Sequence, residues 1–155
     1  ESFEGNTITC EKGTTISFDD FNLEFLNNRY EITGDINEAS MCFKVTTKNN
    51  SVLFLGDLST NNAPKLLETY KDDLTKLNAN YLQLAHHGQR GGSKELYEAI
   101  NPNYAIWCTT VRNYNNWTVN GINTGALKSE ETKGWLSSLN VTDVCPFYKT
   151  IKINL

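Results

Sequence analysis

SVLFLGDLS, residues 51–59, is apolar at nearly every position until it reaches a glycine and an aspartate. Such a run predicts a strand that is buried on both faces. YLQLAHHGQRGG, residues 81–92, repeats the pattern, and its apolar run ends in two histidines and a glycine. Between the two runs, residues 64–77 carry leucines and a tyrosine at helical spacing. This region therefore predicts a strand–helix–strand unit with reactive side chains at both strand ends.

The rest of the chain extends this alternation. Short β-branched and aromatic runs separated by turn residues predict further strands, at residues 6–10, 14–18, 21–26, 40–47, 103–110, 142–148 and 149–155. Helices are expected at 93–100 and 129–139, with Ser93 and Ser129 as N-caps. The order predicts one α/β domain over residues 1–155, a mixed β-sheet with helices on its outer face.

Composition narrows the function classes. The chain has 155 residues, 21% of them charged, and a net charge of -4, which argues against a wide basic face for nucleic acid. No apolar run is long enough to predict a transmembrane segment. The four cysteines form no C-x-x-C pair and are expected to be free thiols, mostly buried; they are Cys10, Cys42, Cys108 and Cys145.

The chemistry concentrates in Asp57, His86 and His87. A carboxylate and an imidazole at neighbouring strand ends are suitable ligands for a transition metal. Adjacent strand residues face opposite ways, so only one of the two histidines would bind the same ion, and the sequence does not choose between them. Each feature also has a plain structural interpretation, because aspartates commonly cap turns and histidines commonly lie on surfaces. Arg90, beside the histidines, is a candidate for binding phosphate.

These stretches together resemble the C-terminal half of the metallo-β-lactamase superfamily. The similarity covers roughly residues 14–110 and is closest to the metallo-hydrolase domain of DNA-uptake competence proteins. It lies in the strand ending in GD at 56–57, the strand ending in HHG at 86–88, and NPNYAIW at 101–107. The resemblance implies half of an αββα sandwich.

It also implies a chemistry. Asp57 would bridge two zinc ions, and His86 or His87 would bind the second ion. A bridging hydroxide would then attack a phosphoester bond, in nucleic acid or in an envelope phosphodiester.

The chain departs from the family in one respect that matters for activity. The H-x-H-x-D-H loop of the family is missing, since no histidine precedes residue 86. Either the chain is the C-terminal portion of a longer enzyme, or it is a degenerate, non-catalytic α/β interaction domain. The intact GD and HHG motifs and the absence of an initiating Met favour the first interpretation. The isolated chain is then expected to bind metal weakly and to show little turnover.

Partners and compartment follow from this interpretation. The inner sheet face would normally pack on the missing N-terminal half, so we expect it to be exposed and to drive homodimerisation. A bacterial cytoplasmic location is favoured by the free cysteines, while a membrane-associated or exported parent stays open.

Residues 111–128 predict a long polar loop. Its Arg112, Tyr114 and Trp117 either face substrate or simply pack, and ordinary packing is the favoured interpretation.

Overall fold

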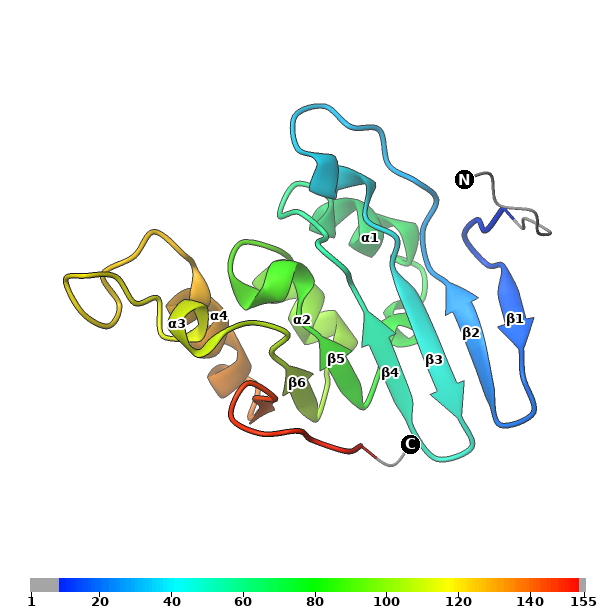
Figure 1. The fold of residues 1–155 in the computed structure, drawn as a ribbon. Helices are drawn as coiled ribbons and strands as arrows, with labels where there is room; N and C mark the ends of the chain where they lie inside the picture. The colour runs from blue at the N-terminus through cyan, green and yellow to red at the C-terminus, as the bar shows by residue number, and fades with distance from the viewer. Residues whose placement is uncertain (1–8, 154–155) are drawn as a thin grey trace, which may run out of the picture.

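The computed structural model describes residues 9–153. Within this range the chain is an α/β fold, with a seven-stranded mixed sheet and four α-helices (Figure 1). The strands are β1 (Thr15–Ser17), β2 (Phe21–Phe25), β3 (Phe43–Thr47), β4 (Ser51–Phe54), β5 (Tyr81–Gln83), β6 (Tyr104–Ile106) and β7 (Thr142–Val144). The helices are α1 (Ala63–Thr69), α2 (Lys94–Ile100), α3 (Val111–Tyr114) and α4 (Ser129–Ser138), with 3₁₀ turns η1 (Ile36–Ala39), η2 (Leu74–Leu77) and η3 (Ala85–Gly88).

The strands follow one another across the sheet in chain order. β1 to β4 pair antiparallel, and β4 to β7 pair parallel. Parallel crossovers are right-handed, so crossovers that all advance in one direction place their helices on the same face. Figure 1 shows α1 and α2 behind the sheet, with α3 and α4 beside it on the β6 side. The opposite face of the sheet receives no helix from the described part of the chain.

The core lies between the sheet and the helices. Leu53, Leu82 and Ala105, side by side on three parallel strands, are fully buried there with Leu66 of α1 and Leu96 of α2. These residues are apolar at strand and helix positions facing one another, and their burial is the main stabilising term of the fold.

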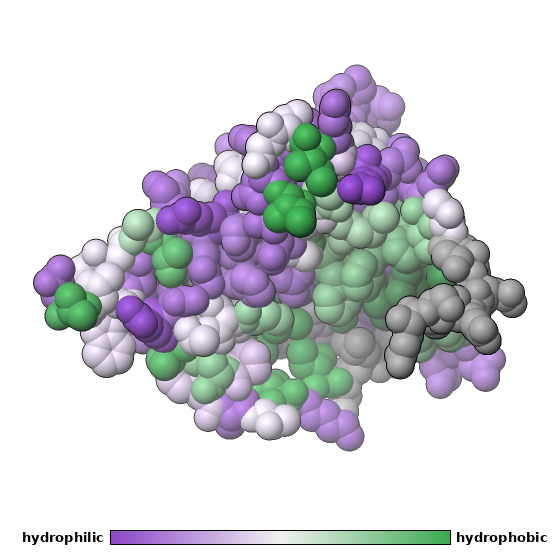
Figure 2. Space-filling view, turned by 45° about the horizontal axis from the view of Figure 1, so that its top comes forward, coloured by the Kyte–Doolittle hydropathy of each residue, from purple (hydrophilic) through white to green (hydrophobic). Residues whose placement is uncertain are grey.

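The other sheet face carries an open aromatic surface, which we call the open face. Phe25, Phe43 and Phe54 form a ladder, with ring centroids 6.2 and 4.7 Å apart. Tyr81 and Tyr104 continue it, with centroids 4.9 Å apart. These rings are only partly buried or exposed, and Figure 2 shows hydrophobic residues gathered over the strands. The predicted exposure of one apolar sheet face is therefore present at the aromatic rings. β4 is buried on both faces at Val52 and Leu53, as its sequence predicted, while Phe54 at its end is only partly buried.

Two helix predictions need correction. The helix expected over 64–77 ends at Thr69, and a separate 3₁₀ turn follows after Asp73. The Asp73 carboxylate accepts a hydrogen bond from the Thr75 amide at 3.2 Å, which caps a new turn in place of a continuous helix. Ser129 is not an N-cap, because Lys128 holds that position and the buried Ser129 hydroxyl donates to the Asn113 carbonyl at 2.8 Å. Ser93, in contrast, caps α2 as predicted, accepting from the Leu96 amide.

Of the terminal strand predictions, the one at 142–148 is confirmed only in part, and the others are wrong where they can be compared. Only Thr142–Val144 of the expected strand 142–148 pairs with β6, and residues 149–153 form no strand. Pro146 lies two residues after Val144 and cannot donate to a sheet ladder. Of the strand expected at 6–10, residues 9 and 10 are irregular, while 6–8 lie outside the described residues, as do 154 and 155.

The cysteines were predicted as mostly buried free thiols. Cys42, Cys108 and Cys145 are free, but only Cys42 is buried, and Cys108 is exposed. Burial raises the pKa of the Cys42 thiol to about 12, which keeps it in the unreactive thiol form.

Candidate functional site

Asp57 and His87 lie next to each other at the ends of neighbouring parallel strands. Because β4 and β5 pair in parallel, the segments that follow them leave the same edge of the sheet. Asp57 Oδ1 and His87 Nε2 are 3.5 Å apart, and both side chains are partly solvent-exposed. The proximity predicted for a carboxylate and an imidazole is therefore confirmed, while their role as metal ligands stays a prediction.

Backbone and amide hydrogen bonds join the two segments. The His86 amide donates to the Gly56 carbonyl at 2.9 Å. The Gln83 side-chain oxygen accepts from the amides of Leu55 and Gly56, at 3.2 and 2.9 Å. Gln83 thus bridges the ends of β4 and β5 and fixes the positions of the residues that follow them.

The two histidines do not lie on a strand. β5 ends at Gln83, and His86, His87 and Gly88 adopt left-handed backbone conformations, with φ of 46°, 59° and 74°. The argument from strand alternation therefore does not apply. Left-handed φ costs a non-glycine residue about 1–3 kcal/mol, so two consecutive histidines held there are a strained feature that the surrounding contacts must maintain.

The hydrogen bonding of His87 points its free lone pair at Asp57. His87 Nδ1 lies 2.7 Å from the Cys108 carbonyl oxygen. A carbonyl can only accept, so Nδ1 carries the proton, and Nε2 of a neutral ring is then an acceptor. Two acceptors, Nε2 and the Asp57 carboxylate, would face each other at 3.5 Å. This arrangement is favourable only when a positive charge, either a proton or a cation, lies between them.

His86 occupies different surroundings. It lines a pocket of about 280 Å³, whose other walls are formed by polar and charged residues: Asp35, Glu38, Ser59, Thr60, Asn61 and Arg90. Its ring centroid is 6.0 Å from that of His87. The sequence left the choice of histidine open, and the geometry pairs His87, rather than His86, with Asp57.

Arg90 reaches this pocket, as expected for a residue beside the histidines, and forms no ion pair within residues 9–153. The buried Ser59 hydroxyl, also on the wall, has no hydrogen-bond partner in the described part of the protein. Arg90 is available to a polar ligand, which keeps phosphate binding by Arg90 as a prediction.

Glu38 is a member of this pocket that the sequence analysis did not identify. It is 3% exposed, and its carboxylate accepts from the Thr33 amide at 2.6 Å, the Thr33 hydroxyl at 2.9 Å and the Gly34 amide at 3.3 Å. The bond from the Thr33 amide is the main cause that holds its pKa below the usual value. Its partners are five and four residues away on an irregular loop, so no periodic signal marks it.

Three glycines allow the histidine segment to pack closely. A Cβ atom at Gly88 would lie 2.3 Å from Trp107, one at Gly91 would lie 2.6 Å from the Leu58 carbonyl, and one at Gly92 would lie 2.7 Å from the Tyr97 hydroxyl. The Gly92 amide also donates to the Leu58 carbonyl at 3.1 Å. The three glycines of HHGQRGG are therefore required by packing, independently of any chemistry at the histidines.

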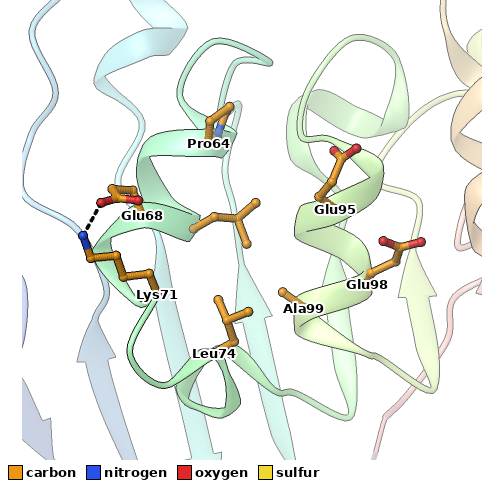
Figure 3. Close-up of a pocket in the computed structure, with 8 residues that line it drawn as sticks. Pro64, Glu68, Lys71, Leu74, Glu95, Glu98 and Ala99 are labelled. Atoms are coloured by element: carbon orange, nitrogen blue, oxygen red, sulfur yellow. Dashed lines mark hydrogen bonds and ion pairs between the residues drawn. The ribbon is translucent and has the colours of Figure 1, made fainter.

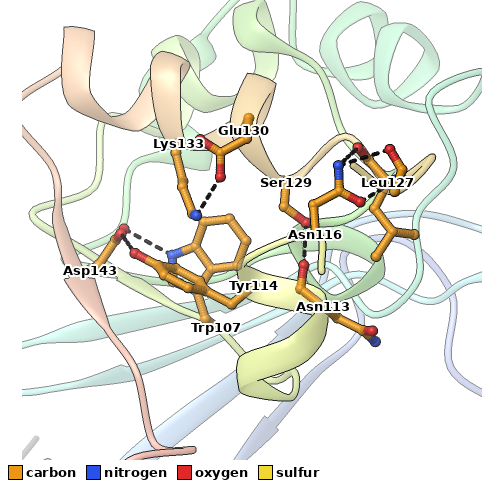
Figure 4. A network of polar contacts seen from close by, with 10 residues as sticks. Trp107, Asn113, Tyr114, Asn116, Leu127, Ser129, Glu130, Lys133 and Asp143 are labelled. Atoms are coloured by element: carbon orange, nitrogen blue, oxygen red, sulfur yellow. Dashed lines mark hydrogen bonds and ion pairs between the residues drawn. The ribbon is translucent and has the colours of Figure 1, made fainter. Parts of the chain in front are cut away.

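A polar network supports Trp107 beneath the histidine segment (Figure 4). Trp107 is fully buried, and its indole nitrogen donates to Asp143 at 2.8 Å. The Tyr114 hydroxyl donates to the other Asp143 oxygen at 2.9 Å, and Lys133 lies 3.8 Å above the Tyr114 ring. Tyr114, considered as a substrate-facing residue, is instead part of this support.

The fit to zinc is incomplete. Within residues 9–153 no group of three or more His, Cys, Asp or Glu side chains can hold a metal ion. A zinc site in an enzyme normally has at least three protein ligands, and Asp57 with His87 supplies two. The part of the chain that the structure describes does not form such a site by itself.

A groove of about 600 Å³ between α1 and α2 contains none of the candidate site residues (Figure 3). Leu67, Leu74 and Ala99 form its apolar part, and Glu68 on its edge pairs with Lys71. Among the described helices, none has the length and apolar character needed to cross a bilayer.

Neither models of known protein families nor curated protein sequences match the chain. The functional argument therefore depends on the residues and their geometry.

Proposed function

We propose that this chain forms the C-terminal half of a metal-dependent hydrolase of the metallo-β-lactamase fold, acting on phosphoester bonds. Asp57 and His87 are the ligands that this half contributes to a zinc site. The observation that carries the proposal is the pair of facing acceptors, Asp57 Oδ1 and His87 Nε2, 3.5 Å apart. A histidine ligand commonly donates its second ring nitrogen to a backbone carbonyl, as His87 does to Cys108.

The remaining ligands must come from a polypeptide that covers the open face. The seven strands carry helices on one side, and no helix of residues 9–153 covers the partly exposed aromatic ladder on the other. An apolar face of this kind marks an interaction surface. We propose that the N-terminal half of the fold occupies it in the parent enzyme, and a second copy of the chain when that half is absent.

The second candidate function is that of a non-catalytic interaction domain of the same fold. It is favoured by the presence of only two donors and by the absence of a three-ligand group in the described residues. In that case a proton, not a metal, lies between His87 and Asp57, and the pair is a surface-exposed ion pair worth about 1 kcal/mol or less.

Zinc titration of the purified chain separates the two. Calorimetry should detect weak binding that falls at least about tenfold in Asp57→Ala and His87→Ala. His86→Ala, which removes the neighbouring ring and leaves the facing pair intact, should change the affinity much less. Equal binding by all four proteins would overturn the ligand assignment.

A further inference from the structure

The loop between α3 and α4 exposes several apolar side chains on a projecting tip. In Figure 1 this segment extends away from the helices and the sheet. Trp117 is 51% exposed, Val119 98% and Ile122 63%. Large apolar side chains at such exposure are unfavourable in water unless they meet a partner.

Hydrogen bonds and close packing fix the conformation of this loop. Asn116 is buried in a left-handed conformation, and its side chain donates to the carbonyls of Gly125 and Leu127 and accepts from the Leu127 amide, at 3.0 to 3.1 Å. A Cβ atom at Gly125 would lie 2.3 Å from the Asn116 side-chain oxygen. The exposed residues are therefore held in place before any partner binds, which lowers the entropy cost of binding.

The tip is a tight hairpin. Thr118 and Gly121 exchange backbone hydrogen bonds of 3.1 Å in both directions. In an antiparallel ribbon the flanking pair lies directly opposite and shares one side, which puts Trp117 across from Ile122. Val119 stands at the turn itself. The tip thus presents a tryptophan and an isoleucine at its base and a valine at its end.

Charged side chains are absent from this segment. Residues 113–127 contain none, although 21% of the chain is charged. Arg112 and Lys128 flank the segment, and Lys128 pairs with Glu131 at 3.5 Å. Moving the tip into an apolar phase therefore requires no charge to lose its water, which is the largest cost of such a transfer.

We propose that the tip, residues 117–122, inserts into the surface of a phospholipid bilayer. Tryptophan is enriched at the depth of the lipid headgroups, and aliphatic side chains enter the acyl boundary below it. The order along the tip, with Trp117 at the base and Val119 at the end, matches this gradient. Nucleic acid fits less well, because bases stack on aromatic rings and the most exposed large apolar side chain of the tip is a valine.

The loop is joined to the histidine segment at both ends. Cys108 accepts from His87, and Gln89 donates through its side chain to the Thr109 hydroxyl at 2.9 Å. At the other end, the Lys128 amide donates to the Gln89 carbonyl at 2.7 Å. Insertion of the tip would hold the histidine segment near the bilayer surface. Resting on the proposed function, the substrate is then a phosphoester displayed at that surface.

The test is sedimentation of the full chain with vesicles of phosphatidylcholine and phosphatidylglycerol at 7:3, without added metal. The chain should pellet with the vesicles, and Val119→Asn with Ile122→Asn should lower the partition coefficient by at least about tenfold. Ile36→Asn is the matched control, because Ile36 is 77% exposed on a different loop. Equal loss in both variants, or no pelleting of the unaltered chain, would overturn the proposal.

Quenching by brominated lipids adds a direct readout. Trp107 is fully buried and Trp135 partly buried, so quenching should be removed by Trp117→Phe. Binding of a single-stranded oligonucleotide in place of vesicles would contradict the assignment. Because these measurements use no metal and no hydrolysis, a failure of the zinc titration leaves their outcome unaffected.

Discussion

Gly88 lies against the indole of Trp107, so closely that a Cβ atom would sit 2.3 Å from the ring. Gly88 also has φ of 74°, which disfavours any side chain. This contact sets how closely the histidine segment packs on the core, and it therefore helps to position His87.

Gly88→Ala should therefore destabilise the protein by about 3 kcal/mol, the sum of a strained φ and a steric overlap in the core. Chemical denaturation measures the change. Gly13→Ala is the matched control, because Gly13 has φ of 83° but no atom near its Cβ position; its cost should be about 1–2 kcal/mol, from backbone strain alone. Equal losses in the two variants would show that Trp107 does not restrict the segment.

Protonation of His87 provides a second test. Nitrogen NMR of the ring should show Nδ1 protonated, since it lies 2.7 Å from the Cys108 carbonyl. Added zinc should shift the Nε2 resonance and leave Nδ1 protonated, and Asp57→Asn should weaken this response. A zinc response confined to His86, or a ring protonated only at Nε2, would contradict the assigned geometry.

The acid stability of the protein should depend on Glu38. Hydrogen bonds, chiefly from the Thr33 amide, lower its pKa in the folded state below the ordinary 4.5. Its contribution is thus complete above pH 4.5 and is lost as the pH falls through the lower, folded-state pKa. Glu38→Gln should be less stable at neutral pH and should lose less stability on acidification. Thermal unfolding between pH 7 and 3 measures both effects.

Glu31→Gln serves as the comparison for that series, because Glu31 is an exposed glutamate of the same loop. Its pH profile should follow that of the unaltered protein. If the stability of Glu38→Gln changed with pH in parallel with that of the unaltered protein, Glu38 would not contribute to the acid stability.

The open face predicts self-association of the isolated chain. Phe54 stacks on Phe43 with ring centroids 4.7 Å apart, near the middle of the sheet. Phe54→Lys should shift the chain from dimer to monomer in sedimentation velocity, because a charge on the apolar face cannot be buried without cost. Ile36→Lys, on an exposed loop, should leave the dimer intact. A monomeric unaltered chain would count against dimerisation through this face.

Local sequence patterns predicted several elements well. The uninterrupted apolar run before Asp57 and the one before His86 gave strands β4 and β5, and the serine before the helical pattern at 94–100 gave the cap of α2. These features depend on residues close together in the chain, where backbone preference and hydrophobic spacing act directly. The break at Asp73 was missed because a helical spacing of leucines continued across a competing cap.

By itself, the sequence determined that a carboxylate and two imidazoles follow neighbouring strands of an α/β sheet. Only the tertiary structure decided that His87 faces Asp57, because that choice depends on a left-handed turn and on a carbonyl of Cys108, 21 residues away. The position of Glu38 in the pocket beside His86 also depends on contacts between distant segments, and so does the support of Trp107 by Asp143. Hydrophobic periodicity specifies which face of an element is buried, but the direction of one polar side chain is set by partners that only the folded chain brings together.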